Sequence, residues 1–412
     1  MKIFKRNIEA NLITALKDTP VILLNGARQS GKTFLLKEMV RKKIISDYIT
    51  FDNIEPFTVA TREPEDFLNR FKGSVILDEI QRIPEIFVSI KANVDRKRTP
   101  GKFILSGSAD IFQLPKLTDS LAGRIEIHTL YPLSQLEINN KKGSFVDYIF
   151  SKKNRWDSLP KVSRKKIFSS IFRGGFPSVQ NKPLNRLNDW FGSYINTIIQ
   201  RDIRDISKIE KHSDIPGILE VLASRTMQLY NNAAISSSLK LPQTTMTRYI
   251  KLLRMVYLVD FMRPYSRNIT KRISKAHKLY FTDTGVISFL LNLSSSFDNP
   301  FRGQIFENFV IMEIIKQISW SKVKPKIYFY RDFDGNEVDL ILELRGGDFI
   351  AIEIKASTSV KPNDFKGLKM LKAQTGNKFL KGFVIYMGDN IYPYDKDIYS
   401  LPVNTLWDQP FI

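Results

Sequence analysis

The octapeptide at residues 26–33 has the residue types and the spacing of a phosphate-binding loop. Its glycines would let backbone amides surround the phosphates of a nucleotide, Lys32 would reach the β- and γ-phosphates, and the Thr33 hydroxyl would hold Mg²⁺. A buried strand is predicted before the loop and a helix after it, which is the context that the motif requires. The predicted nucleotide contacts are Gly26, Ala27, Arg28, Gln29, Ser30, Gly31, Lys32 and Thr33.

Two adjacent carboxylates, Asp78 and Glu79, end a second predicted strand at residues 74–79. Asp78 is predicted to bind the magnesium ion and its water shell. Glu79 is placed to polarise the attacking water, so Glu79 and Lys32 are the predicted catalytic residues of this part of the chain. An acidic pair after a strand is common by itself. Together with the loop at 26–33 it indicates a nucleotide site.

Further strands are predicted at 47–51, 102–108 and 124–130, with helical spacers between several of them. Alternating strands and helices favour a mostly parallel sheet with the nucleotide outside the carboxyl ends of its strands. Ser106 and Ser108 end the fourth strand, where a hydroxyl can sense the γ-phosphate or the water. Their alternative role is to form a turn.

A predicted hairpin at 336–355 carries charges among branched apolar residues. The register that pairs apolar with apolar residues also places Asp339 opposite Glu353. Two facing carboxylates are unfavourable unless a cation lies between them, and Lys355 or, with better geometry, a divalent metal ion would serve. Glu307 is a third acid, on the buried side of an apolar helix predicted at 303–318. Its alternative role is a first-turn glutamate that the helix dipole favours.

The composition limits the kind of chemistry. The chain has no cysteine, and its three histidines are too scattered to suggest a metal motif, so any metal must be a hard cation with oxygen ligands. No apolar run approaches the roughly 20 residues needed to cross a bilayer, and the start lacks the apolar core of a signal peptide. We therefore expect a cytoplasmic protein without membrane contact.

The positive charge of the chain is concentrated in its middle. Of the formal net charge of +21, residues 141–270 carry +14, from 23 Lys and Arg against 9 Asp and Glu. Such a segment is typical of nucleic-acid binding, although it also keeps proteins soluble or binds acidic partners. Helices predicted between 215 and 260, followed by a strand-like tail at 257–265, a basic loop and a strand at 279–283, favour a winged helix-turn-helix. That module contacts DNA or packs against proteins.

The segments GARQSGKT, VILDEIQRIPEIF, FILSGSADIF and LAGRIEIHTLYPLSQLE resemble the AAA-superfamily P-loop ATPases of bacteria and archaea that carry a C-terminal domain of unknown function. The resemblance spans nearly the whole chain. It implies ATP as the ligand and hydrolysis as the reaction. It also makes Arg124 a candidate for contacting nucleotide charge, in its own subunit or in a neighbour's, with a surface arginine as the alternative.

The helical Glu307, the strand residue Asp339, and the Glu353-x-Lys355 pair together resemble the site of restriction-endonuclease-like nucleases of the PD-(D/E)xK superfamily. The resemblance implies that Asp339 and Glu353 hold Mg²⁺, that Lys355 positions or activates the water, and that Glu307 supports the metal. Glu337 departs from the pattern, because it replaces the proline of the motif. A nuclease-like fold kept only for binding is the alternative.

We therefore expect an α/β protein of three parts: a P-loop NTPase with a parallel sheet at 1–140, a helical and winged-helix domain at 141–283, and a restriction-endonuclease-like α/β domain at 284–412. The predicted function is ATP hydrolysis acting on DNA through a Mg²⁺-dependent nuclease-like domain. The alternative is a nucleotide-gated regulatory protein with a protein partner. The sequence leaves oligomerisation open.

Overall fold

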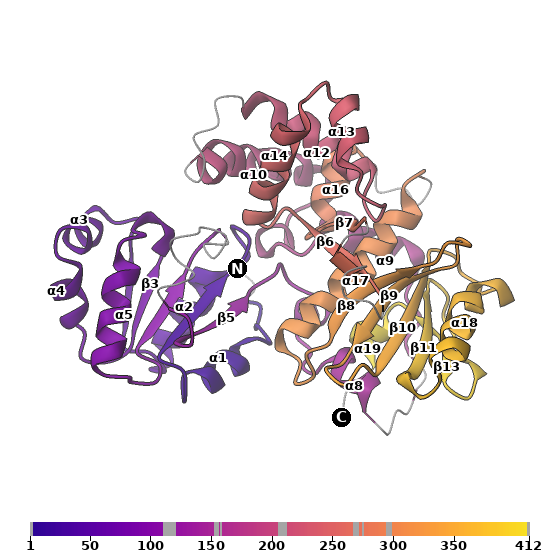
Figure 1. The fold of residues 1–412 in the computed structure, drawn as a ribbon, viewed down its shortest axis with the longest axis horizontal. Coiled ribbons are helices and arrows are strands. Elements are labelled where there is room, and N and C mark those ends of the chain that lie inside the picture. Colours follow the sequence, from indigo (N-terminus) through magenta and orange to yellow (C-terminus); the bar gives the residue numbers. More distant parts are fainter. Residues whose placement is uncertain are drawn as a thin grey trace.

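Two β-sheets, each with helices packed on it, and a further group of helices make up the chain, and this group lies above the two sheets in the view of Figure 1. The structure is a computed structural model that describes residues 3–109, 121–151, 156, 159–204, 212–266, 272–273, 276–293 and 299–409. Parts of two sequence features lie outside the described residues: the end of the FILSGSADIF segment and much of the basic stretch between the two predicted wing strands.

The first sheet has five strands, all parallel, in the order β2-β3-β4-β1-β5. Alternate residues of β1 pack on opposite faces, with Val21 and Leu23 in one apolar cluster and Ile22 and Leu24 in another. Helices thus cover both faces, as expected for a P-loop NTPase fold. All five predicted strands are present: β1 Val21–Asn25, β2 Asp47–Thr50, β3 Val75–Asp78, β4 Phe103–Ser106 and β5 Ile125–Thr129. The helices are α1 Glu9–Ala15, α2 Lys32–Arg41, α3 Ile54–Arg62, α4 Pro64–Asn69 and α5 Ile86–Arg96.

Helices dominate the middle of the chain. A π-helix, η5, Ile198–Ile203, extends α10. The three helices predicted between 215 and 260 are found as α12, α13 and α14, and the last of them ends at Met255. The α-helices of this part are α7 Gln135–Ile138, α8 Phe145–Phe150, α9 Arg164–Arg173, α10 Leu187–Thr197, α12 Ile215–Ser224, α13 Asn232–Ser238, α14 Gln243–Met255 and α16 Thr284–Leu290.

The second sheet is mixed and has eight strands in the order β12-β13-β11-β10-β9-β8-β6-β7. The predicted hairpin is present as β9 and β10, which pair antiparallel. The long helix α17, Arg302–Trp320, packs on this sheet, and α18, Lys366–Thr375, and α19, Thr405–Asp408, follow. The strands are β6 Val259–Pro264, β7 Lys278–Phe281, β8 Lys326–Arg331, β9 Glu337–Glu343, β10 Phe349–Lys355, β11 Phe379–Tyr386, β12 Tyr392–Asp395 and β13 Ile398–Pro402.

The second sheet crosses the predicted boundary between residues 283 and 284. The antiparallel pair β6 and β7, expected as a wing, joins the sheet because β6 pairs in parallel with β8. A second contact joins the middle and the carboxyl-terminal parts, because Phe145 of α8 packs against Phe383 of β11 with ring centroids 6.4 Å apart. The middle and the carboxyl-terminal parts share one apolar core, so packing does not mark a limit between them. The predicted domain limits therefore stay a prediction. None of the described helices is long and apolar enough to span a membrane.

Candidate nucleotide site and carboxylate cluster

The loop after β1 bends sharply at two glycines. Gly26 has a φ of +140°, and a Cβ there would lie 2.2 Å from the carbonyl oxygen of Leu130. Gly31 has a φ of +100° and precedes α2, whose first residue is Lys32. These left-handed conformations suit glycine and let the backbone wrap a phosphate group.

Lys32 is folded back onto this loop and is only 6% exposed. Its Nζ donates hydrogen bonds to the carbonyl oxygens of Gly26 (2.8 Å) and Ala27 (2.9 Å). Burial lowers the pKa of Lys32 to about 8, against the opposing effect of Glu79 and Asp78. The ammonium group is thus held, poorly solvated, where phosphate oxygens would be its natural partners.

The predicted magnesium ligands lie together at the carboxyl ends of the strands. The Thr33 hydroxyl donates to Oδ2 of Asp78 at 3.0 Å, and the Tyr48 hydroxyl donates to the same oxygen at 2.5 Å. Asp78 is 2% exposed. A hydroxyl and a carboxylate beside a phosphate loop fit Mg²⁺, which binds through a few protein oxygens together with phosphates and water.

Glu79 follows directly in a left-handed conformation, with a φ of 59°. The side-chain amide of Gln81 donates to its Oε2 at 2.5 Å. Burial and the neighbouring Asp78 raise the pKa of Glu79 above its ordinary value. A carboxylate that is held in this way and has a raised pKa can accept a proton from water.

A pocket of about 610 Å³ joins these residues. Glu79, Lys32 and Thr33 line it, together with Arg28, Gln29 and Gly31 of the loop. Pro177, Ser178 and Asn181 close it from the helical part. Its size suits a nucleotide, and its wall includes a segment that sequence reasoning did not assign to the site.

The two serines predicted at the end of the fourth strand differ in their access to the pocket. Ser106 ends β4 beside Asp78 and is fully buried, and its hydroxyl lacks a hydrogen-bond partner among the described residues. Ser108 lines the pocket and accepts a hydrogen bond from Gln81 at 3.3 Å.

Arg124 lies at the amino-terminal ends of the strands, on the side of the sheet away from the phosphate loop. It precedes β5, level with the start of β1, and its Nε is 2.5 Å from Oδ1 of Asp95. The length of a five-residue strand, about 16 Å, separates it from the phosphate loop. A contact with its own nucleotide is therefore not supported, while a contact in a neighbouring subunit stays a prediction.

Two residues outside the predicted nucleotide contacts hold the phosphate loop. Arg6, buried before α1, donates from Nη1 to the carbonyl oxygen of Ser30 at 2.7 Å and from Nε to Glu137 at 3.0 Å. Asp202 of the π-helix η5 accepts a hydrogen bond from Arg28 at 2.8 Å. The loop is thereby tied to the N-terminal segment and to the helical part.

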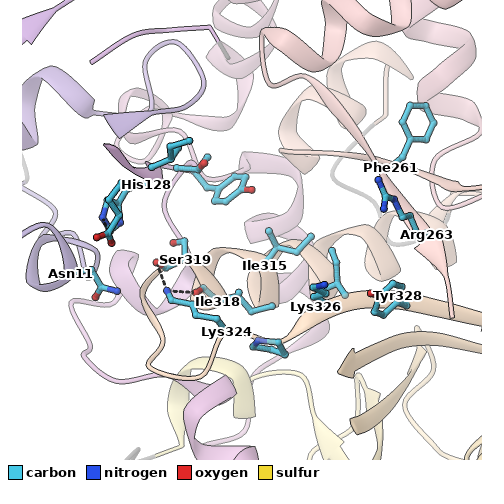
Figure 2. Close-up of a pocket in the computed structure, with 16 residues that line it drawn as sticks. Asn11, His128, Phe261, Arg263, Ile315, Ile318, Ser319, Lys324, Lys326 and Tyr328 are labelled. Carbon is cyan, nitrogen blue, oxygen red and sulfur yellow. Dashed lines mark hydrogen bonds and ion pairs between the residues drawn. The ribbon is translucent and has the colours of Figure 1, made fainter. Parts of the chain in front are cut away.

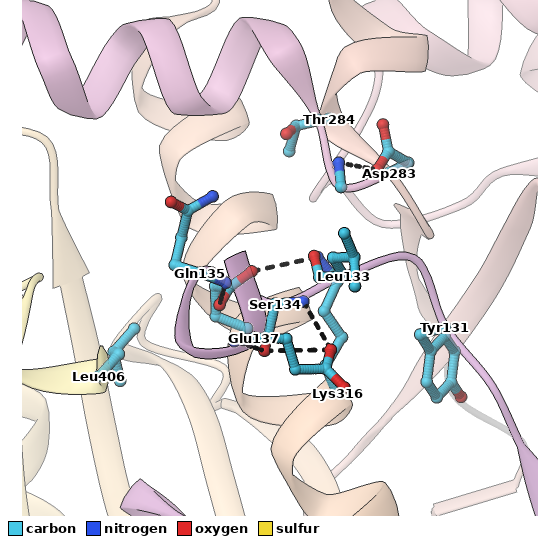
Figure 3. Close-up of polar contacts among 12 residues, drawn as sticks. Tyr131, Leu133, Ser134, Gln135, Glu137, Asp283, Thr284, Lys316 and Leu406 are labelled. Carbon is cyan, nitrogen blue, oxygen red and sulfur yellow. Dashed lines mark hydrogen bonds and ion pairs between the residues drawn. The ribbon is translucent and has the colours of Figure 1, made fainter. Parts of the chain in front are cut away.

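A buried polar junction, formed by residues 133–137 and α17, continues this connection (Figure 3). The backbone amide of Gln135 donates to Glu313 at 2.7 Å, and Lys316 donates to Glu313 at 3.1 Å and to the carbonyl oxygen of Leu133 at 3.0 Å. Glu137 and Ser134 form a capping box at the start of α7. The junction therefore connects the first sheet with the helix that carries Glu307.

A cleft of about 590 Å³ lies beside the junction, between the edge strand β5 and the second sheet (Figure 2). His128 of β5 faces Glu126, and Lys324 donates to the last carbonyls of α17, those of Ile318 and Ser319, at 2.8 Å each. No predicted site residue lines this cleft.

The predicted carboxyl-terminal residues do come together. The paired positions of β9 and β10 run to Leu340 and Ile352, so Asp339 and Glu353 are the next residues in register. Oδ2 of Asp339 accepts a hydrogen bond from the Ile354 amide at 2.8 Å, and Lys355 lies 2.6 Å from Oε1 of Glu353. Burial is the main cause that raises the pKa of Glu307 to about 8 and the pKa of Glu353 well above its ordinary value. The negative charge of Asp339 is the second cause for both.

Lys278 of β7, which sequence reasoning did not single out, lies within this carboxylate cluster. Its Nζ is 2.9 Å from Glu307, contacts Glu337, and is 3.7 Å from Asp339. Burial would lower the pKa of Lys278, but these carboxylates raise it above the ordinary value. Within the described part of the chain, no three or more His, Asp or Glu side chains are placed to hold a metal ion. The metal ligands predicted in this cluster are therefore not arranged as a metal site in this structure.

Three family models match separate segments of the chain. Residues 18–139 match the model of an AAA domain. Residues 164–296 and 302–406 match two domains of unknown function, DUF8612 and DUF4143. The uncharacterized protein Rv2008c of Mycobacterium tuberculosis is 29% identical over 412 residues, covering 98% of this chain and 85% of that protein. The uncharacterized protein MJ1544 of Methanocaldococcus jannaschii is 23% identical over 379 residues, covering 89% and 80%.

Two solved structures are among the matches, both with low overall similarity. A single-residue variant of RuvB of Thermotoga maritima has a TM-score of 0.30 and 17% identity, over 62% of this chain and 88% of that chain. AMPPCP-bound DnaA of Aquifex aeolicus has a TM-score of 0.30 and 14% identity, over 59% and 86%. The family match at residues 18–139, together with the parallel sheet and the loop after β1, gives the N-terminal part of this chain an AAA-type P-loop ATPase fold.

Proposed function

We propose that this protein binds ATP with Mg²⁺ and hydrolyses it. The observation that carries the proposal is the convergence of Lys32, Thr33, Asp78 and Glu79 at the carboxyl ends of β1 and β3. A phosphate loop, a pair of metal-ligand side chains and a candidate base are the parts that such a reaction needs.

Each residue has a distinct role in this proposal. Lys32 exchanges its two loop carbonyls for phosphate oxygens when ATP binds. Thr33 and Asp78 would hold Mg²⁺, which neutralises phosphate charge. Glu79, held by Gln81, orients the attacking water and accepts its proton.

The test compares Lys32→Ala with Lys17→Ala in assays of ATP binding and ATP turnover. Lys17 is an exposed residue just after α1, so its substitution removes the same charge away from the pocket. We expect Lys32→Ala to lose nucleotide binding or turnover and Lys17→Ala to behave as the wild type. Full ATPase activity in Lys32→Ala would refute the assignment.

We further propose that the ATPase acts on DNA. The net charge of +14 in residues 141–270 supports it, and so does the exposed face of α14, which carries Thr244, Arg248 and Lys251. The other face of this helix is buried through Met246, Tyr249 and Leu253. A helix with this arrangement can present its polar face to a DNA groove.

DNA binding is tested by fluorescence anisotropy at several salt concentrations. We expect the double variant Arg248→Glu/Lys251→Glu to bind DNA more weakly and with a smaller salt dependence, because phosphate contacts are lost. The control, Lys17→Glu/Lys72→Glu, reverses two exposed charges of the ATPase part. Equal DNA binding by wild type and both variants would exclude α14 as the contact, and no DNA binding by the wild type would favour the protein partner.

DNA cleavage through a Mg²⁺-dependent carboxyl-terminal site stays a prediction. The approach of Glu307, Asp339, Glu353 and Lys355 supports it, but Lys278 lies among the carboxylates where a metal ion would bind. The position of Lys278 favours the alternative, a nucleotide-gated protein whose carboxyl-terminal domain binds without cutting. Incubation of wild type, Asp339→Ala and Lys355→Ala with linear, nicked and branched DNA and Mg²⁺ or Mn²⁺ decides between them. Cleavage that both substitutions abolish would establish the nuclease.

A further inference from the structure

Lys278 is anchored on both sides of its strand. The amide of its neighbour Leu279 donates to the carbonyl oxygen of Gln228 at 3.0 Å. The side chain of Asn308 bonds both the amide and the carbonyl oxygen of Phe281, each at 2.9 Å. Asn308 follows Glu307 directly in α17, so the strand that carries Lys278 is fixed to the helix that carries its partner.

The side chain of Lys278 reaches carboxylates from two other elements. It is 2.9 Å from Oε1 of Glu307 on α17, and on β9 it contacts Glu337 and lies 3.7 Å from Oδ1 of Asp339. The residue is 3% exposed, so these ion pairs replace hydration that the ammonium has lost. A lysine buried to this degree is normally found only when it is paired.

Most of the oxygens that a metal ion would use are already engaged. Oδ1 of Asp339 faces Lys278, Oδ2 accepts the Ile354 amide at 2.8 Å, and Oε1 of Glu353 faces Lys355 at 2.6 Å. Oε2 of Glu353 is buried without a hydrogen-bond partner among the described residues. A divalent ion bound to this oxygen would also need an oxygen of a second carboxylate. To reach one, it would have to displace a contact that this carboxylate already makes.

We propose that Lys278 is the built-in cation of the carboxylate cluster and takes the place of a divalent metal ion. The cluster then joins the β6–β7 strand pair to α17 and β9 without a metal, and metal binding requires removal of the Lys278 charge. The proposal concerns only the carboxyl-terminal cluster, so the outcome of the ATPase tests does not affect it.

The test is a Mn²⁺ titration of the full chain without nucleotide, followed by electron paramagnetic resonance of free Mn²⁺. Four proteins are compared: wild type, Lys278→Met, Lys278→Met/Asp339→Asn, and Lys355→Met. The last removes the same charge but leaves Lys278 in place. Dependence on Asp339 separates this site from weak binding at Asp78.

We expect Lys278→Met to gain one bound Mn²⁺ per chain and the added Asp339→Asn substitution to abolish it, while wild type and Lys355→Met bind none at the cluster. Asp339-dependent Mn²⁺ binding by the wild type would overturn the proposal, as would a folded Lys278→Met protein that binds no Mn²⁺. If Lys278→Met does not fold, Lys278→Gln/Glu307→Gln replaces an ion pair by a neutral pair, keeps Asp339 and Glu353, and is expected to gain the same ion. Its failure to bind would contradict the proposal.

Discussion

Arg6 and Glu137 form a buried ion pair, with Nε of Arg6 3.0 Å from Oε1 of Glu137, although 131 residues separate them. The other nitrogens of Arg6 donate to the carbonyl oxygens of Ser30 in the phosphate loop and Tyr131 after β5. Glu137 in turn caps α7 together with Ser134. One guanidinium thus connects the nucleotide loop to the segment that leads into α17.

We expect Arg6→Met to lower the free energy of unfolding by about 3–5 kcal/mol, because it leaves Glu137 buried without its charge partner. The control is Arg41→Met, which removes an exposed i,i+3 pair with Glu38 and should cause no measurable change. Urea denaturation followed by circular dichroism measures both. A similar midpoint for the two variants would show that Arg6 does not stabilise this junction.

The affinity for ATP should depend on pH through Lys32. Burial lowers its pKa to about 8 in the free protein, and phosphate oxygens would raise it in the complex. Below pH 8 the lysine is charged in both states. Above pH 8 the free protein must take up a proton on binding, so affinity should fall by about tenfold per pH unit.

Isothermal titration calorimetry between pH 7 and 9.5, in buffers of different ionisation enthalpy, measures this proton uptake. The control variant is Lys32→Arg, whose guanidinium stays charged over the whole range. Its affinity should have a flat pH dependence in this range even if it is lower. A flat profile for the wild type would contradict the assigned state of Lys32.

The strands that bear the nucleotide site could be predicted because their signal is local. Strands such as Val21–Asn25 and Val75–Asp78 are fully buried and read as short apolar runs. The register of the β9–β10 hairpin followed from alternation, because a one-residue slip would move each side chain of the strand to the other face of the sheet. These features depend on neighbours within about twenty residues.

Contacts between distant segments left no comparable signal. The pairing of Arg263 with Tyr328 brings β6 into the second sheet, and Lys278 came from a stretch that looked like an exposed basic wing. One clue was available: Glu313 and Lys316 are a charged pair in the most apolar part of α17, and such a pair indicates a buried polar contact.

Glu79→Gln should separate ATP binding from hydrolysis. The amide keeps the size of the side chain but cannot accept the proton, so we expect kcat to fall by about 10²–10⁴ while the Kd for ATP changes little. Glu85→Gln is the matched control, since Glu85 is exposed at the start of α5. A phosphate-release assay and a fluorescent ATP analogue report the two quantities. A normal kcat in Glu79→Gln would assign the base elsewhere.

Gly26→Ala should abolish nucleotide binding by displacing the phosphate loop. A Cβ at this position meets the backbone oxygen of Leu130 at 2.2 Å, and that oxygen cannot rotate away as a side chain could. The φ of +140° adds strain for any L-residue other than glycine. Gly217→Ala in α12 is the control, because an added Cβ there has no atom within 4 Å and alanine favours the helix by about 0.5–1 kcal/mol. We therefore expect Gly217→Ala to bind ATP normally with equal or higher stability, whereas Gly26→Ala loses binding of the fluorescent ATP analogue. Retained affinity in Gly26→Ala would mean that the turn at the end of β1 is not what shapes the phosphate site.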